Sequence, residues 1–478
     1  MEFRLGAFAE LVKKMVIALR SPFPVPCSPF PVTRNPRWWT SFKSGDMLAE
    51  RVEAFFLGCF RCDNLGVAMG SIGFRNSWLG LVCVSWLPFL ALSLLRGGGQ
   101  KPAVGEQPKA GRVSFVRQQL DPAFRSEGVA VGDFNHDGKL DIAAGFAWYE
   151  APDWKMHPIV EKMPEYVPMG YSNSFCNFAE DLNGDGWTDL IVVDFPGTPT
   201  WWFENPKQTG HPWKKHLCIP VTNNESPQYV DLDGDGKREL VMAFGPSTEK
   251  SDGPDRQMGF AKPQQDPYAP WVIHPISEKG APACQKYSHG LGIGDVNKDG
   301  RNDIVCPEGW WEAPAKGATG LWQFHAASLG GRGAQMYVYD FDGDGDNDII
   351  GSEPHGFGLW WFEQLADDQW KQHEIDRSVS QLHGVCLVDI NGDGLPDIVT
   401  GKRWKAHWTG DPGVDEPALF CWFELKREKG TAHWTRHQFD DDSGPGTQFE
   451  IADVNGDGLP DVVTSNKKGV HYFRQVRE

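Results

Sequence analysis

The sequence has 478 residues and a formal net charge of −18. The negative charge is concentrated after residue 100, where 58 acidic residues outnumber 35 basic ones, whereas residues 1–100 hold 6 acidic and 11 basic residues. A body this acidic repels the phosphates of nucleic acids and attracts cations, so we exclude nucleic-acid binding.

An uncharged apolar segment precedes the acidic body. Residues 77–95 form a run of 19 residues without a charge, between Arg75 and Arg96. This length is typical of the core of a signal peptide or of a single membrane span. In either case the positive flank stays inside, so we expect an exported protein that is secreted, periplasmic or anchored at the cell surface.

The chain divides into four predicted segments. Met69 begins a conventional leader, so we interpret residues 1–68 as a non-structural N-terminal extension and residues 69–96 as a signal peptide or membrane anchor. Residues 97–110 are rich in Gly, Pro and polar residues and predict a linker. Residues 111–478 carry all of the repeats and are the predicted folded domain.

One pattern, Asp-x-Asp/Asn-x-Asp-Gly-x-x-Asp/Glu, recurs seven times in this domain. The copies begin 48, 50, 64, 45, 49 and 64 residues apart, which is the size of a four-stranded propeller blade. They are DFNHDGKLD at 133–141, DLNGDGWTD at 181–189, DLDGDGKRE at 231–239, DVNKDGRND at 295–303, DFDGDGDND at 340–348, DINGDGLPD at 389–397 and DVNGDGLPD at 453–461.

The residue types of the repeat predict calcium loops. Positions 1, 3, 5 and 9 supply oxygen ligands, and Gly at position 6 permits a sharp turn, which together suit Ca²⁺ better than Zn²⁺ or Mg²⁺. A single copy would also fit an acidic hairpin turn, but seven clusters of carboxylates without cations would repel themselves. We therefore expect about seven Ca²⁺ ions. The predicted ligands are Asp133, Asn135, Asp137, Asp141, Asp181, Asn183, Asp185, Asp189, Asp231, Asp233, Asp235, Glu239, Asp295, Asn297, Asp299, Asp303, Asp340, Asp342, Asp344, Asp348, Asp389, Asn391, Asp393, Asp397, Asp453, Asn455, Asp457 and Asp461.

Two further strands are expected in each repeat. A third strand contains an aromatic pair followed by an acid, as in Trp148–Glu150, Trp201–Glu204, Trp310–Glu312, Trp360–Glu363 and Trp422–Glu424. A fourth contains Trp-x-x-His, as in Trp154/His157, Trp213/His216, Trp271/His274, Trp322/His325, Trp370/His373 and Trp434/His437. Because both sets recur evenly, we interpret them as packing residues between blades rather than as ligands.

The last repeat lacks a fourth strand at its C-terminal end. Residues 115–121 align with residues 434–440, so the N-terminal strand is expected to complete the last blade. Such a splice removes the open edges of a ring. The predicted fold is all-β, a seven-bladed β-propeller of four-stranded blades that is closed by an N-terminal strand and preceded by an apolar leader or anchor.

These seven loops resemble the FG-GAP, or VCBS, repeats of integrin α-subunit propellers and of exported bacterial proteins. The resemblance covers roughly residues 111–478 and implies a calcium-binding seven-bladed propeller, with calcium on one face and ligands on the other. The segments His289–Asp295 and Pro307–Glu312 also resemble the propeller of the fungal aldos-2-ulose dehydratases.

Polar residues are expected at the mouth opposite the calcium loops, where innermost strands begin and second-to-third-strand loops meet. His289, His355 and His383 fall on consecutive repeats outside the Trp-x-x-His set, and with Glu308 they are our candidate catalytic residues. They could hold a transition metal such as Zn²⁺, act as acid and base on a sugar, or form a polar rim around a wet channel. The other residues expected at this mouth are Glu127, Glu225, Gln335, Gln448, Glu353, Lys402 and Arg403.

Three functions remain open from the sequence. The leading prediction is an extracytoplasmic recognition module for a carbohydrate or an extracellular protein. The alternative is a metal-assisted sugar lyase or dehydratase with its site at the mouth, and the third is a structural surface protein. Whether the three histidines converge distinguishes the enzyme hypothesis from the other two.

Overall fold

The computed structural model describes residues 111–316, 318, 320–366 and 369–478, all within one compact unit. The predictions for residues 1–68, 69–96 and 97–110 lie outside this part. Within the described residues, no helix is both long and apolar enough to cross a membrane.

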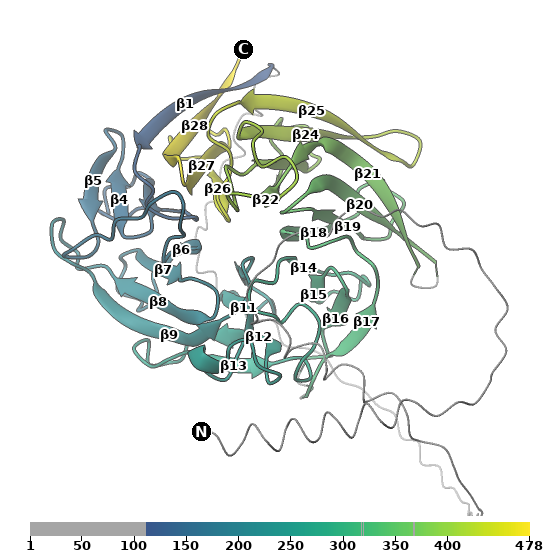
Figure 1. Cartoon of the computed structure of the whole chain (residues 1–478), viewed down its shortest axis with the longest axis horizontal. Coiled ribbons are helices and arrows are strands. Elements are labelled where there is room, and N and C mark those ends of the chain that lie inside the picture. Colours follow the sequence, from purple (N-terminus) through teal and green to yellow (C-terminus); the bar gives the residue numbers. More distant parts are fainter. Residues whose placement is uncertain (1–110, 317, 319, 367–368) are drawn as a thin grey trace, which may run out of the picture. The chain divides into compact units, whose positions relative to one another are not determined.

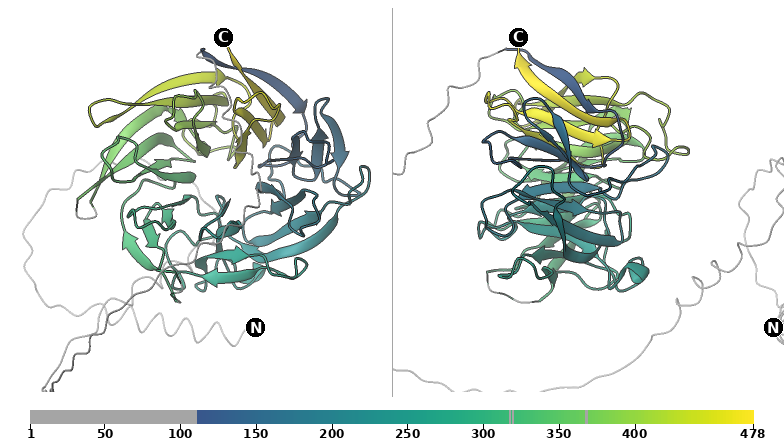
Figure 2. Two further views of the ribbon diagram at one scale, coloured as in Figure 1. Left: turned by 180° about the vertical axis from the view of Figure 1, so that it is seen from behind. Right: turned by 90° about the vertical axis from the view of Figure 1, so that its left-hand side faces the viewer.

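The described residues form an all-β, propeller-like arrangement of sheets that follow one another around a common centre (Figure 1, Figure 2). Five of these sheets are four-stranded blades. Three of them follow chain order: β2 (Ala130–Gly132), β3 (Asp141–Ala144), β4 (Ala147–Glu150) and β5 (Lys155–Pro158); β6 (Cys176–Glu180), β7 (Asp189–Val193), β8 (Thr198–Glu204) and β9 (Lys214–Thr222); and β10 (Gln228–Val230), β11 (Glu239–Phe244), β12 (Gln257–Lys262) and β13 (Val272–Pro275).

The two other four-stranded sheets are formed near the C-terminus. One contains β22 (Leu382–Val388), β23 (Asp397–Lys402), β24 (Leu419–Arg427) and β25 (Ala432–Asp440). The other has the order β1 (Val113–Asp121), β28 (Gly469–Arg477), β27 (Asp461–Asn466) and β26 (Phe449–Ala452). Strand β1 therefore pairs with the last strand of the chain, antiparallel, from Val113 opposite Arg477 to Asp121 opposite Val470 (Figure 1).

The remaining strands form one eight-stranded sheet. Its order is β17 (Gln323–Ala326), β16 (Gly309–Glu312), β15 (Asp303–Cys306), β14 (Leu291–Gly294), β18 (Gln335–Tyr339), β19 (Asp348–Ser352), β20 (Phe357–Leu365) and β21 (Gln369–Ser380). A short 3₁₀ helix, η2 (Thr248–Lys250), lies between β11 and β12.

A parallel pairing of β14 with β18 joins the two halves of this sheet. Two glycines of β14 permit the close approach. A Cβ on Gly292 would lie 2.5 Å from the carbonyl oxygen of Met336, and a Cβ on Gly294 would lie 2.5 Å from Cβ of Val338. Any larger residue at either position would push the strands apart.

The seven predicted loops lie at the connections between first and second strands of the repeats. In the first loop, Asp133 accepts hydrogen bonds from the backbone N–H groups of Asp137 (3.0 Å) and Gly138 (2.9 Å), and Gly138 has a φ of 85°. The buried Asp141 accepts from Phe134 N–H (3.1 Å) and from Ala151 N–H (2.8 Å), just after β4. The last aspartate of the loop thus ties the first hairpin to the end of the third strand.

The hydrophobic core lies between adjacent sheets. Trp202 of β8, for example, packs in one cluster with Tyr229 of β10 and Leu240 of β11. The Trp-x-x-His histidines differ from our interpretation, because they stack within a sheet instead of between blades. In five repeats the histidine ring lies 4.1–4.4 Å from a third-strand tryptophan ring, as His216 does on Trp202.

Candidate functional site

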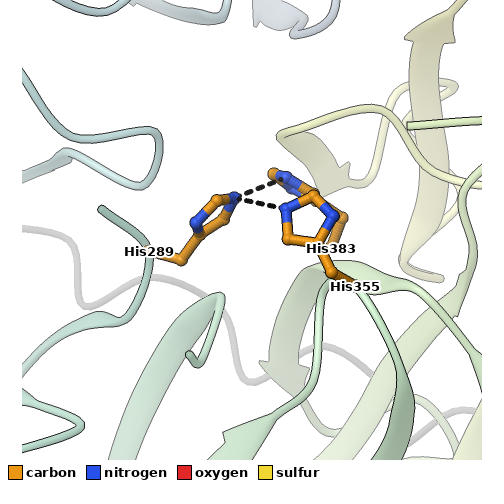
Figure 3. A group of neighbouring side chains, drawn as sticks. All are labelled: His289, His355 and His383. Carbon is orange, nitrogen blue, oxygen red and sulfur yellow. Dashed lines mark hydrogen bonds between the residues drawn. The ribbon is translucent and has the colours of Figure 1, made fainter. Parts of the chain in front are cut away.

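Three predicted histidines converge although they are far apart in the chain. His289 lies just before β14, His355 between β19 and β20, and His383 in β22. The Nε2 atom of His289 lies 3.0 Å from Nε2 of His383 and 3.3 Å from Nε2 of His355 (Figure 3). The three imidazoles therefore direct their Nε2 atoms toward a common point.

Glu225 completes this cluster from the segment before β10. Its Oε2 lies 3.3 Å from Nε2 of both His289 and His383, and its side chain is largely buried. Burial alone would raise the pKa of Glu225, but the charges and hydrogen bonds of the two histidines hold it below its usual range. The sequence placed Glu225 at the mouth without assigning it to the site.

A second carboxylate orients the third histidine from behind. Asp411 Oδ2 lies 3.2 Å from Nδ1 of His355 and 3.0 Å from Nδ1 of His407. The His407 ring stacks on His355 with centroids 4.7 Å apart. Asp411 and His407 lie in the connection between β23 and β24. Our sequence analysis missed these two residues because this connection does not recur in the other repeats. Its only signal is length, since the sixth repeat spans 64 residues.

His355 and His383 favour the neutral form. Burial, followed by the neighbouring His383 and His289, lowers the pKa of His355 to about 3, although Asp411 opposes this shift. Burial also lowers the pKa of His383. A neutral imidazole offers a lone pair to a metal ion, and a carboxylate on its other nitrogen fixes the tautomer that does so.

The spacing of the donor atoms fits a transition metal. In a tetrahedral zinc site with bonds of about 2.0–2.1 Å, neighbouring ligand atoms lie about 3.3 Å apart. Nε2 of His289 lies 3.0–3.3 Å from Nε2 of His383, Nε2 of His355 and Oε2 of Glu225, and Oε2 of Glu225 lies 3.3 Å from Nε2 of His383. The ligand nitrogens of the three histidines all lie within 4.8 Å of one another. Three imidazoles and one carboxylate also match the ligand types that zinc and similar ions prefer.

Glu308, our fourth candidate, lies outside the cluster. It is exposed, and it lines the same cavity without belonging to the group of converging ligand atoms. Glu308 lies in the short connection from β15 to β16. The carboxylate that contacts the histidines is that of Glu225, which lies 3.3 Å from both His289 and His383.

The other predicted mouth residues mostly hold sheets together. Gln335 accepts a hydrogen bond from Val385 N–H (3.0 Å), and Gln448 accepts one from Val129 N–H (2.9 Å), so each side chain bridges two sheets. Glu127 and Arg403 form a buried ion pair. Of the remaining two, Lys402 is buried, and Glu353 accepts a hydrogen bond from the backbone N–H of His355 (3.2 Å).

A cavity of about 470 Å³ adjoins the histidines. Its walls include His289, His355 and Glu225, together with the aromatic and basic side chains Tyr171, Phe195, Lys286, Tyr287 and Arg332. Lys286 Nζ lies 4.9 Å from the Tyr287 ring and 5.8 Å from the Phe195 ring. The cavity therefore combines aromatic faces with two basic side chains, Lys286 and Arg332, and two carboxylates, Glu225 and Glu308.

Comparison with known proteins identifies the repeats. The FG-GAP-like repeat family matches residues 181–242 and 310–400, and the FG-GAP repeat family matches residues 127–150. Three segments of the chain are therefore similar to FG-GAP repeats. These segments contain or border five of the seven acidic loops, in agreement with the resemblance found in the sequence.

The chain is also similar to an integrin α-subunit. Integrin alpha pat-2 of Caenorhabditis briggsae is 22% identical over 268 residues, which cover 51% of this chain and 19% of the relative. The chain therefore spans about a fifth of the length of that relative. This likeness supports an integrin-like FG-GAP assignment for the repeats.

Solved structures resemble the chain only distantly. A lectin of Agrocybe aegerita that recognises non-reducing terminal N-acetylglucosamine has a TM-score of 0.41 at 14% identity and covers 77% of this chain and 86% of its own. The exotype rhamnogalacturonan lyase YesX has a TM-score of 0.39 at 13% identity, with coverage of 75% and 72%.

Proposed function

We propose that the histidine cluster is a transition-metal centre of the zinc type that acts on a sugar bound in the adjoining cavity. The convergence of three Nε2 atoms and one carboxylate oxygen supports the metal, and the Asp411–His355 contact supports it independently. The aromatic walls suit a polyhydroxylated ligand, and Lys286 and Arg332 could bind an anionic group on it beside the carboxylates Glu225 and Glu308 of the same cavity.

The reaction class that we propose for this site is that of a lyase or dehydratase. A bound metal ion would act as a Lewis acid on a substrate oxygen. Lys286 and Arg332 would bind an anionic group of the substrate, while Tyr171 and Tyr287 would pack on its ring. The resemblance to the propeller of aldos-2-ulose dehydratases, noted in the sequence, would fit the same hypothesis. That resemblance stays a prediction.

Metal analysis of the full chain, purified without chelators or metal-affinity resin, tests the centre. We expect about one transition-metal ion in the wild type and its loss in His383→Ala. His373→Ala is the matched control, because His373 stacks on Trp361 and contacts Glu363 outside the cluster; it should keep the metal. A wild type that holds no transition metal would refute the proposal.

The second candidate is a recognition module with an extracellular protein or carbohydrate ligand, favoured by the FG-GAP repeats and the integrin α relative. A recognition function of this kind would place the chain outside the cytoplasm. A glycan array with the wild type and His383→Ala separates the two candidates. Equal glycan binding by both proteins, without metal, would favour recognition alone.

We further propose that the eight-stranded sheet represents two blades joined along β14 and β18, which makes seven blades, and that β1 closes the ring. The sheet divides into two sets of four antiparallel strands, each with its own acidic loop, which supports this count. We also propose that the acidic loops bind Ca²⁺, because each gathers carboxylates at the same connection of its repeat.

A further inference from the structure

The third acidic loop lies beside a basic residue where other repeats have an acid. In five of the seven repeats the third strand ends in a glutamate that contacts a fourth-strand histidine at 2.5–3.1 Å. Lys262 occupies the equivalent position of β12, because Phe260 lies opposite His274 as Trp148 lies opposite His157. The last sheet has Arg474 there, and no ion pair joins Arg474 to the described residues.

Lys262 directs its ammonium group into the loop. Its Nζ lies 2.5 Å from Asp233 Oδ2, 3.3 Å from Asp235 Oδ2 and 3.1 Å from Glu239 Oε1. These carboxylates occupy positions 3, 5 and 9 of the loop, and Glu239 is only 1% exposed. An ammonium group has three N–H donors, so Lys262 can donate one to each carboxylate.

The third loop also differs at its ninth position. The other six loops have aspartate there; in the first loop, both carboxylate oxygens of Asp141 accept backbone N–H groups. Glu239 is one methylene longer. Its Oε2 accepts from Leu232 N–H at 2.9 Å, which leaves Oε1 for Lys262. The two residues that depart from the repeat, Lys262 and Glu239, therefore contact each other.

Basic residues at other loops make a smaller contact. Lys139 reaches only Asp137, at 2.7 Å, and Lys207 reaches only Asp185, at 2.9 Å. Both carboxylates are at position 5 of their loops. Among the described loops, a basic side chain contacts three carboxylates only at Lys262.

We propose that Lys262 closes the third loop in place of calcium, so that the chain binds six calcium ions instead of seven. This inference rests on the proposed calcium binding of the other loops. A Ca²⁺ ion needs oxygen ligands at about 2.3–2.6 Å. An ion among these oxygens would lie against the ammonium group and be repelled by it.

Calcium stoichiometry of the full chain tests this assignment. Native mass spectrometry after equilibration in micromolar free Ca²⁺ should give six ions for the wild type. Lys262→Glu restores the acid of the other repeats, and it should bind one more ion than the wild type. Lys262→Ala should do the same if the glutamate variant folds poorly. Lys139→Ala, which removes the one-carboxylate contact, should leave the count unchanged.

The outcomes are distinguishable. An extra ion in either Lys262 variant but not in Lys139→Ala supports the assignment. Seven ions in the wild type, or equal counts in folded Lys262 variants and wild type, would overturn it. A wild type without bound calcium would instead refute the calcium proposal for all of the loops.

Discussion

Buried histidines have two different roles in this protein. Those of the candidate metal centre face one another and a carboxylate, whereas His471 of β28 is buried, with neither ring nitrogen hydrogen-bonded to the described residues. Burial, and then the nearby Arg117, lower the pKa of His471 to about 4. Asp440 and Asp442 oppose this shift but do not cancel it.

His471 should make the domain sensitive to acid. An unfolded histidine has a pKa of about 6.5, so between pH 6.5 and 4 the unfolded chain binds more protons than the folded one, and the free energy of unfolding falls as the pH falls. The full loss is roughly 3 kcal/mol for this shift. Urea unfolding of His471→Leu and wild type at pH 7 and pH 4.5 should show a smaller pH dependence in the variant.

The same substitution at an exposed histidine serves as the control. His433 lies on the solvent face of β25. His433→Leu should keep the pH dependence of the wild type. If His471→Leu loses as much stability on acidification as the wild type does, the buried imidazole is not the source of the effect.

The sequence predicted individual site residues with uneven success. His289, His355 and His383 could be found because they stand outside the repeated Trp-x-x-His set. Glu225 and Glu127 looked alike in the sequence, yet Glu225 contacts histidines and Glu127 pairs with a buried arginine. Only the folded chain separates such roles, since partner identity depends on contacts between distant repeats.

At the scale of elements, β1 is the strand whose removal is most informative. It covers the edge of β28 along its length, and Arg117 Nη1 also contacts Asp440 at the end of β25, 2.8 Å away. Deletion of residues 111–121 would expose the backbone N–H and C=O groups of β28. We expect aggregation or loss of cooperative unfolding, measured by light scattering and thermal melting.

A substitution within β1 provides the comparison for this deletion. Val116 is 49% exposed, so Val116→Thr should keep the pairing and the melting curve of the wild type. A deleted chain that remains monomeric with unchanged stability would show that β1 does not close the ring.

Strands were easier to predict than the pairing of sheets. The acidic loops and aromatic pairs marked most strands, because each repeat places the same residue type at the same step of the pleat. The parallel pairing of β14 with β18 was not predicted. It depends on Gly292 and Gly294 facing a particular neighbour, which no single repeat reveals.

At the scale of the whole molecule, calcium should determine stability. Every loop except the third, which Lys262 closes, gathers carboxylates that repel one another without an ion, and a site filled at 100 times its Kd stabilises the folded state by about 2.7 kcal/mol. We expect excess EGTA to lower the Tm of the full chain by many degrees, and Ca²⁺ in excess of the chelator to restore it. A melting curve that EGTA leaves unchanged would contradict calcium binding.

The position of the histidine cluster has a mechanical consequence. His289 and His355 are carried by the two halves of one continuous sheet, His383 belongs to the next sheet, and Glu225 precedes the first strand of the sheet before it. An ion bound by all four would join three neighbouring sheets at one point. Such an ion would cross-link the sheets, so that any separation of these sheets would have to break metal–ligand bonds. The affinity for the ion would then report how stably the three sheets are held together at this site.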